Sequence, residues 1–228
     1  MAWTEAWAVN EEQQLPTYEA ALERVGVRRG DRVLDVGCGT GVFLRMCADR
    51  GAAVAGLDAS ETMIARARAR VPEADLRVGD LQAVPFDDDA FDLVTGFSSF
   101  FYAGDVVAAL TEAGRVARPG AAVVAQVFGR PERCALDALK RGAPWRPEIV
   151  EEVMPLPVEQ SFDVTWAYEY AGDDALVAAM RAAGAVSASS SAILDALGPC
   201  RQPDGSYRVS NEWHIVVARV GRTSTPAE

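Results

Sequence analysis

The stretch Val33–Gly41, which reads VLDVGCGTG, decides the fold of this chain. An apolar strand runs directly into a glycine-rich turn, and a helical pattern begins at its end. Gly37, Gly39 and Gly41 allow the backbone to turn tightly and let a ligand approach where any side chain would collide. The stretch therefore predicts a strand, a ligand-binding turn and a helix in direct succession.

The same rhythm continues on the C-terminal side of this stretch. Short apolar runs, typical of strands buried on both faces, alternate with helical patterns. The expected strands are residues 31–36, 52–58, 74–79, 91–97 and 121–128. The expected helices begin near Gly41, Ser60 and Asp105. This alternation predicts an α/β, Rossmann-like, doubly wound and mostly parallel sheet with an antiparallel last strand and helices on both faces.

We expect a single domain over residues 1–220, with a disordered tail at 221–228. Residues 1–30 would form an N-terminal helical cap, with a helix over about 11–28. Prolines break the pattern after residue 128, so residues 129–160 are a candidate lid or substrate-specific insertion. A strand at 164–170, a helix at about 173–183, a short helix ending near Leu197 and a last strand at 212–220 would complete the domain.

Composition excludes several classes of function for this 228-residue chain. The formal charge of -11 opposes binding to a phosphate backbone, so nucleic acid is not an expected partner. No apolar run approaches the roughly 20 residues of a membrane span, and the N-terminus does not read as a secretory signal, so we expect a cytoplasmic protein. The four cysteines, Cys38, Cys47, Cys134 and Cys200, have no metal or redox spacing and read as reduced structural thiols.

Glycine spacing indicates which ligand the turn binds. A dinucleotide-binding turn requires G-x-G-x-x-G, but here the third glycine comes one residue early and Val42 holds the expected place. An acid, Asp35, stands at the strand end just before the turn. An acid followed by G-x-G-x-G resembles the first motif of class I S-adenosylmethionine-dependent methyltransferases. The alternative is a strand-helix junction that uses glycine for geometry alone.

Two further acids follow strands in the next two units. Asp58 ends the second strand, where its carboxylate can accept both hydroxyls of a ribose, and its alternative role is to cap the helix near Ser60. Asp80 follows the third strand with Leu81 beside it. This pair can bind a purine, with the carboxylate on the exocyclic amine and the leucine against the ring. A solvated loop acid is the alternative for Asp80.

Together with TEAGRVARPGAAVVAQVF at 111–128, these motifs resemble class I methyltransferases of the ubiquinone/menaquinone-biosynthesis type over roughly residues 18–128. The resemblance implies S-adenosylmethionine as cofactor, S-adenosylhomocysteine as product and a site across the strand ends. Asp35 and the glycine turn would lie near the methionine part, Asp58 would hold the ribose, and Met63 and Asp80 would contact the adenine. The full set of implied cofactor-binding residues is Tyr18, Asp35, Gly37, Cys38, Gly39, Gly41, Asp58, Ala59, Met63, Asp80, Leu81 and Phe97.

The fourth strand ends in GFSSFFYAGD, which should border the transferring methyl group. Phe100, Phe101 and Tyr102 are candidates for an acceptor pocket, with plain core packing as the alternative for each. Core packing is also the alternative for Tyr18. The stretch lacks the N-P-P-Y type motif of enzymes that methylate DNA bases, and this favours a small-molecule acceptor.

No catalytic residue is assigned. The only histidine, His214, lies in the apolar alternation of the last expected strand and reads as structural. No carboxylate cluster suggests a metal, so we expect a metal-independent enzyme in which positioning supplies most of the acceleration. The primary hypothesis is methyl transfer to a small biosynthetic acceptor. Its rivals are cofactor-assisted cyclisation or elimination, and cofactor binding without catalysis. The oligomeric state is left open, with a homodimer as one option.

Overall fold

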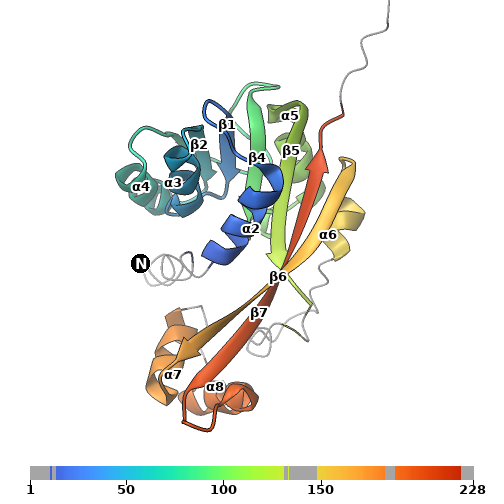
Figure 1. Ribbon diagram of the computed structural model, residues 1–228. Helices are drawn as coiled ribbons and strands as arrows, with labels where there is room; N and C mark the ends of the chain where they lie inside the picture. The colour runs from blue at the N-terminus through green and yellow to red at the C-terminus, as the bar shows by residue number, and fades with distance from the viewer. Residues whose placement is uncertain (1–10, 12–13, 131–132, 134–147, 183–187, 222–228) are drawn as a thin grey trace, which may run out of the picture. The chain divides into compact units, whose positions relative to one another are not determined.

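A computed structural model describes residues 11, 14–130, 133, 148–182 and 188–221 of the chain (Figure 1). The helices of this part are α2 Leu15–Val25, α3 Val42–Asp49, α4 Glu61–Arg70, η1 Phe100–Tyr102, α5 Val106–Val116, α6 Glu148–Val153, α7 Asp173–Ala182, α8 Ser190–Leu197 and η4 Gly198–Cys200. The strands are β1 Arg32–Val36, β2 Ala53–Asp58, β3 Asp75–Val78, β4 Phe91–Phe97, β5 Ala117–Phe128, β6 Val158–Tyr170 and β7 Tyr207–Arg219.

The strands form one seven-stranded sheet in the order β3-β2-β1-β4-β5-β7-β6. β1 pairs in parallel with β2 and β4, β2 with β3, and β4 with β5, while the last strands are antiparallel. The predicted fold class is confirmed. The strand order reverses between β1 and β4, and ligands of such sheets bind at this switch point, outside the carboxyl ends of the strands.

The chain divides into two compact units. The larger unit holds residues 18–127, 148–162 and 215–228, and the smaller unit holds residues 1–17, 128–147 and 163–214. The expectation of one domain over 1–220 stays a prediction. Residues 1–10 of the expected cap, residues 134–147 of the expected insertion and residues 222–228 of the expected tail lie outside the described residues.

The core of the larger unit is aliphatic. Val33, Leu34, Leu57, Val94 and Val123 are completely buried, as expected for parallel strands covered on both faces. In Figure 1, α2 crosses in front of β4 and α5 lies behind β5. Both predicted helix caps form: the Ser60 hydroxyl accepts from the Met63 amide, and the Asp105 carboxylate accepts from the Ala108 amide.

The smaller unit has a core of its own. α7 and α8 contribute Leu176, Val177, Met180, Ile193 and Leu197, and β7 contributes Tyr207 and Val209. The Tyr207 hydroxyl donates a hydrogen bond of 2.9 Å to Oδ1 of Asp173 at the start of α7. These contacts fix the two helices against this part of β7.

Several element bounds differ from the sequence predictions. β5 begins at Ala117 instead of residue 121, because Ala117 pairs with Phe91 before the register shifts and the parallel ladder continues. β6 begins at Val158 and β7 at Tyr207, so both are longer than predicted. The N-terminal helix covers Leu15–Val25 instead of 11–28. It ends before residue 28 because Gly26 takes a left-handed φ of 69° and its amide donates to the Leu22 carbonyl, which closes the helix.

Candidate functional site

The glycine turn is held tightly between two strands. Gly37 has a φ of 77°, and a Cβ placed on it would lie 2.4 Å from Cβ of Ser99, at the end of β4. The Gly37 and Cys38 amides both donate to the Leu57 carbonyl on β2, at 2.6 and 2.9 Å. The turn therefore has no room for a side chain at its first glycine, and its backbone is fastened to the neighbouring strand.

Asp58, at the end of β2, presents a fixed carboxylate. Its Oδ2 accepts from the Gly39 amide at 3.0 Å, and its Oδ1 accepts from the Ser60 amide at 2.8 Å. Burial raises the pKa of this carboxyl, and the two amide bonds act in the opposite direction. Each oxygen keeps a further lone pair, so the carboxylate can still accept from two ligand hydroxyls. The alternative role of Asp58 was to cap the following helix, but the N-cap of α4 is Ser60.

A cavity of about 330 Å³ lies beside Asp58, at the ends of β2 and β3. It is lined by Ala59, Val78, Gly79, Asp80, Leu81, Gln82, Tyr102, Ala103 and Gly104. The expected cofactor-binding residues Ala59, Asp80 and Leu81 therefore come together, and Tyr102 joins them. Oδ1 of Asp80 accepts from the Gln82 amide at 2.9 Å, which orients the carboxylate in its loop. Met63 does not line this cavity; it is buried in the first turn of α4.

Tyr18 belongs to a packed aromatic cluster in the larger unit. Its ring centroid lies 4.6 Å from that of Phe97 and 5.5 Å from that of Phe43, and the Phe43 and Phe97 centroids are 4.7 Å apart. Phe43 was not a sequence candidate. Its signal was available, because it is the second residue of the helix that the glycine turn opens, next to the expected cofactor site. The cluster forms an apolar support behind the turn.

Asp35 and Cys38 both point away from open solvent. Asp35 is 3% exposed, and its Oδ1 accepts a 2.7 Å hydrogen bond from the Thr95 hydroxyl of β4. Sγ of Cys38 lies 2.8 Å from the position of a Cβ on Gly56, so this side chain fills the space that the glycine leaves. The backbone of Cys38 therefore forms part of the turn, while its thiol packs into the core.

The ends of β4 and β5 hold three polar residues that the sequence analysis did not single out. Ser98 has a φ of 52°, an unfavourable value for a residue with a Cβ, and its hydroxyl donates to Oε1 of Gln126 on β5 at 3.1 Å. Oγ of Ser99 and Nε2 of Gln126 are buried without a hydrogen-bond partner in the described chain. Strained backbone and unpaired buried donors are both enriched at ligand sites.

The three aromatic acceptor candidates lie in different environments. Phe100 is completely buried and packs against Gly96, which agrees with the core alternative. Phe101 is partly buried with its ring 4.5 Å from that of Tyr102, and Tyr102 is 59% exposed on the cavity beside Asp80. An acceptor role for these residues stays a prediction.

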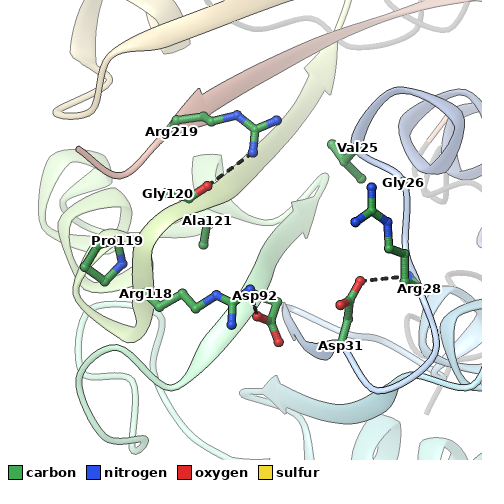
Figure 2. A pocket seen from close by; sticks show the side chains of 10 residues that line it. All are labelled: Val25, Gly26, Arg28, Asp31, Asp92, Arg118, Pro119, Gly120, Ala121 and Arg219. Atoms are coloured by element: carbon green, nitrogen blue, oxygen red, sulfur yellow. Dashed lines mark hydrogen bonds and ion pairs between the residues drawn. The ribbon is translucent and has the colours of Figure 1, made fainter. Parts of the chain in front are cut away.

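A second cavity, of about 730 Å³, lies at the opposite edge of the sheet (Figure 2). Its walls come from the amino ends of β1 and β4 and from the start of β5. Figure 2 shows three arginines around it, Arg28, Arg118 and Arg219. Two of these arginines form ion pairs, Arg118 with Asp92 and Arg219 with Glu159, while the Asp31 carboxylate accepts from the backbone amide of Arg28. Because ligands of parallel α/β sheets bind at the carboxyl ends, we do not assign the cofactor to this cavity.

His214 lies on β7 within the smaller unit. Its Nδ1 is 2.8 Å from Oδ1 of Asp163 on β6, and Arg130 lies 3.4 Å from Oδ2 of the same carboxylate. The histidine side chain is mostly buried. His214 therefore links β7 to β6 through Asp163.

We predict that His214→Gln lowers the free energy of unfolding by about 1 to 2 kcal/mol and leaves turnover nearly unchanged, because the change removes an interstrand contact. Thermal melting and the rate constant of the folded variant measure the two effects. Asp163→Asn is the matched change on the partner strand and should lower stability similarly. A hundredfold loss of rate at an unchanged melting temperature would instead make His214 a general base.

The described ranges contain no group of three or more His, Cys, Asp or Glu side chains that could hold a metal ion. In the same ranges, every helix is too short or too polar to cross a bilayer. Metal independence and a cytoplasmic location stay predictions.

Comparison with known proteins identifies the domain. A family model described as a methyltransferase domain matches residues 34–125, which covers the glycine turn, Asp58 and Asp80. Residues of the chain are 38% identical over 120 positions to a demethylmenaquinone methyltransferase of Beutenbergia cavernae, a match that covers 53% of this chain and 50% of that protein. Residues 34–125 match a methyltransferase domain, and the predicted resemblance to class I S-adenosylmethionine-dependent methyltransferases is confirmed for this part of the chain.

Other relatives of the methyltransferase domain have different named substrates. A malonyl-[acyl-carrier protein] O-methyltransferase of Serratia marcescens is 39% identical over 95 residues, which are 42% of this chain and 37% of that protein. The crystal structure of a putative methyltransferase from Bacillus halodurans has a TM-score of 0.68 at 15% identity, covering 90% of this chain and 98% of that chain. The chain spans about half the length, or less, of the curated relatives described here, and the structural likeness shows the fold alone.

Proposed function

We propose that this chain transfers a methyl group from S-adenosylmethionine to a small-molecule acceptor in biosynthetic metabolism. One observation carries the proposal: the Asp58 carboxylate is fixed by amides from two turns, next to the cavity that Asp80 and Leu81 line. A carboxylate with two remaining lone pairs can accept from both ribose hydroxyls, and a cavity lined by Asp80 and Leu81 can take an adenine. The relatives named as methyltransferases support the same assignment.

The residues present fit the cofactor. Asp58 would accept the ribose hydroxyls, Asp80 would accept from the adenine amine, and the glycine turn would admit the methionine part where a Cβ has no room. When bound, the cofactor supplies a methyl group on a sulfonium, which is a good leaving group. The chain's own contribution would be to orient the two reactants and to exclude water, with the cluster of Tyr18, Phe43 and Phe97 as the dry support.

The acceptor side is proposed at the ends of β4 and β5. Phe97 and Gln126 pair in register, so their side chains leave the sheet on the same face. The Gln126 amide is completely buried and is held by Ser98, which leaves Nε2 as a donor. An acceptor that carries a carbonyl, phenolate or carboxylate oxygen would satisfy it. The relatives' named substrates, a quinone precursor and a malonyl thioester, both carry such oxygens.

Product analysis tests this proposal against cofactor-assisted cyclisation or elimination. The protein is incubated with S-adenosylmethionine and candidate acceptors that carry phenol or carboxylate groups, and both products are followed by mass spectrometry. We expect one equivalent of S-adenosylhomocysteine for each acceptor that gains one methyl group. An acceptor that changes its ring count or loses water without formation of S-adenosylhomocysteine would support the rival reaction.

The raised pKa of Asp58 predicts a pH dependence of cofactor binding. Because burial raises this pKa, the free protein takes up the proton at a higher pH than an ordinary aspartate, whose pKa is about 3.9. Only the ionised carboxylate accepts from both ribose hydroxyls, so affinity for S-adenosylhomocysteine should be constant at neutral pH and fall as the pH drops through the raised pKa. Calorimetry over this pH range measures the effect. The Asp58→Asn variant should bind weakly at every pH; a wild-type-like profile from it would assign the titration to another group.

A further inference from the structure

Ser99 carries a buried hydroxyl group that no hydrogen bond within the described part of the chain explains. It follows β4, is 5% exposed, and its Oγ has no hydrogen-bond partner in the described part of the chain. An unpaired buried polar group destabilises a folded protein relative to a paired one. Alanine would fill the same space without that cost, so the hydroxyl indicates a partner that the protein itself does not contain.

The position of Ser99 shows which part of the site it faces. Its Cβ and Oγ lie 2.4 and 3.1 Å from the place where a Cβ on Gly37 would stand. It also lies against Gly96, where a Cβ would come within 2.8 Å of the same Oγ. Ser99 is therefore packed directly against the first glycine of the turn, at the switch point between β1 and β4.

The amides at the start of the turn are already used within the protein. The Gly37 and Cys38 amides donate to the Leu57 carbonyl, and the Gly39 amide donates to Asp58. A carboxylate bound at this turn needs hydrogen-bond donors, and these three amides are not available to it. An ammonium group needs hydrogen-bond acceptors instead, and the Asp35 carboxylate and the backbone carbonyls at this edge can supply them.

We propose that the Ser99 hydroxyl donates a hydrogen bond to the α-carboxylate of the cofactor's methionine part. Ser99 thereby selects ligands that carry the amino-acid end of the cofactor over ligands that carry only its nucleoside. The inference rests on the proposed function, since it assumes that the turn holds S-adenosylmethionine. The inference adds Ser99 to the cofactor-binding residues of the glycine turn and to Asp35, Asp58 and Asp80. It assigns Ser99 to one group of the ligand, the α-carboxylate.

Three ligands separate the possible roles of Ser99. S-adenosylhomocysteine has the carboxylate and the amine, decarboxylated S-adenosylhomocysteine keeps only the amine, and methylthioadenosine lacks both. Their dissociation constants are measured by calorimetry for the wild type, Ser99→Ala and Thr111→Ala. Thr111→Ala is the control, because the Thr111 hydroxyl is exposed on α5 and donates to the Val107 carbonyl of the same helix.

We expect Ser99→Ala to weaken S-adenosylhomocysteine binding about tenfold or more, the usual effect of losing a hydrogen bond to a charged group. Binding of the other two ligands should not change, and Thr111→Ala should keep the wild-type values of all three constants. The melting temperature of ligand-free Ser99→Ala should be equal to or above that of the wild type, because the lost hydroxyl has no partner there.

Other outcomes would overturn the inference in distinct ways. An equal loss for S-adenosylhomocysteine and its decarboxylated form would place the hydroxyl on the amine. Unchanged binding of all three ligands, or a lowered melting temperature with a uniform loss, would make Ser99 purely structural while the cofactor assignment stands. Failure of the wild type to bind any of the three would instead refute the proposed function.

Discussion

Asp58→Ala is expected to weaken binding of S-adenosylhomocysteine by roughly 2 to 4 kcal/mol, since two ribose hydroxyls would lose a charged acceptor in a partly dry site. The structure adds a reason for a large effect, because both carboxylate oxygens are already oriented by the Gly39 and Ser60 amides. The mutation removes this preorganised acceptor and also frees the turn. Calorimetry on the folded variant gives the loss directly.

The fold should survive Asp58→Ala. Burial disfavours the charged form of Asp58, so removal of the carboxylate also removes a desolvation cost, which offsets the loss of two amide bonds. Asp87→Ala is a suitable control, because Asp87 is an exposed acid in the turn that follows Asp80. The control should bind like the wild type. If Asp58→Ala keeps its fold and its wild-type dissociation constant, Asp58 does not belong to the site.

Gly37→Ala should strongly destabilise the larger unit. An L-residue with a Cβ pays about 1 to 2 kcal/mol for the left-handed conformation, and forcing a methyl group against Ser99 adds about 1 to 3 kcal/mol. We therefore expect a loss of roughly 2 to 5 kcal/mol in the free energy of unfolding. Cofactor binding should be lost as well, because the methyl group displaces the strand end. Denaturant unfolding and calorimetry measure both effects.

The double variant Gly37→Ala with Ser99→Gly separates the two costs. Removal of the serine side chain relieves the collision but leaves the backbone conformation unfavourable, so stability should be recovered only in part. A double-mutant cycle gives the coupling between the two positions. A Gly37→Ala variant that unfolds and binds like the wild type would contradict the tight packing of the turn.

Most of the fold was predictable because its signals are local. The apolar runs and the glycine turn placed β1 to β4 within a residue of their observed bounds, and the caps at Ser60 and Asp105 form as expected. The start of β5 was missed because Pro119-Gly120 reads locally as a turn. There, pairing of Ala117 with Phe91 outweighs the local preference, and no local pattern reports which residues pair across a sheet.

The candidate site was predictable in part for the same reason. Asp58, Asp80 and Leu81 follow strands at recognisable places, and the structure brings Asp80 and Leu81 to one cavity. Ser99 and Gln126 could not be singled out, because a serine or glutamine gains meaning only when its neighbours leave it buried and unpaired. Phe100 shows the converse, since an aromatic residue at a strand end can line a pocket or pack in the core, and its complete burial in the structure distinguishes the two.

The central claim is that the glycine turn and Asp58 hold S-adenosylmethionine and not a dinucleotide, and one calorimetric comparison tests it most directly. S-adenosylhomocysteine and NAD are titrated in turn into the same preparation of the full chain. The spacing Gly37, Gly39 and Gly41, with Val42 where a dinucleotide-binding turn has its third glycine, predicts micromolar binding of S-adenosylhomocysteine and no heat from NAD. Tight binding of NAD with no response to S-adenosylhomocysteine would contradict the account.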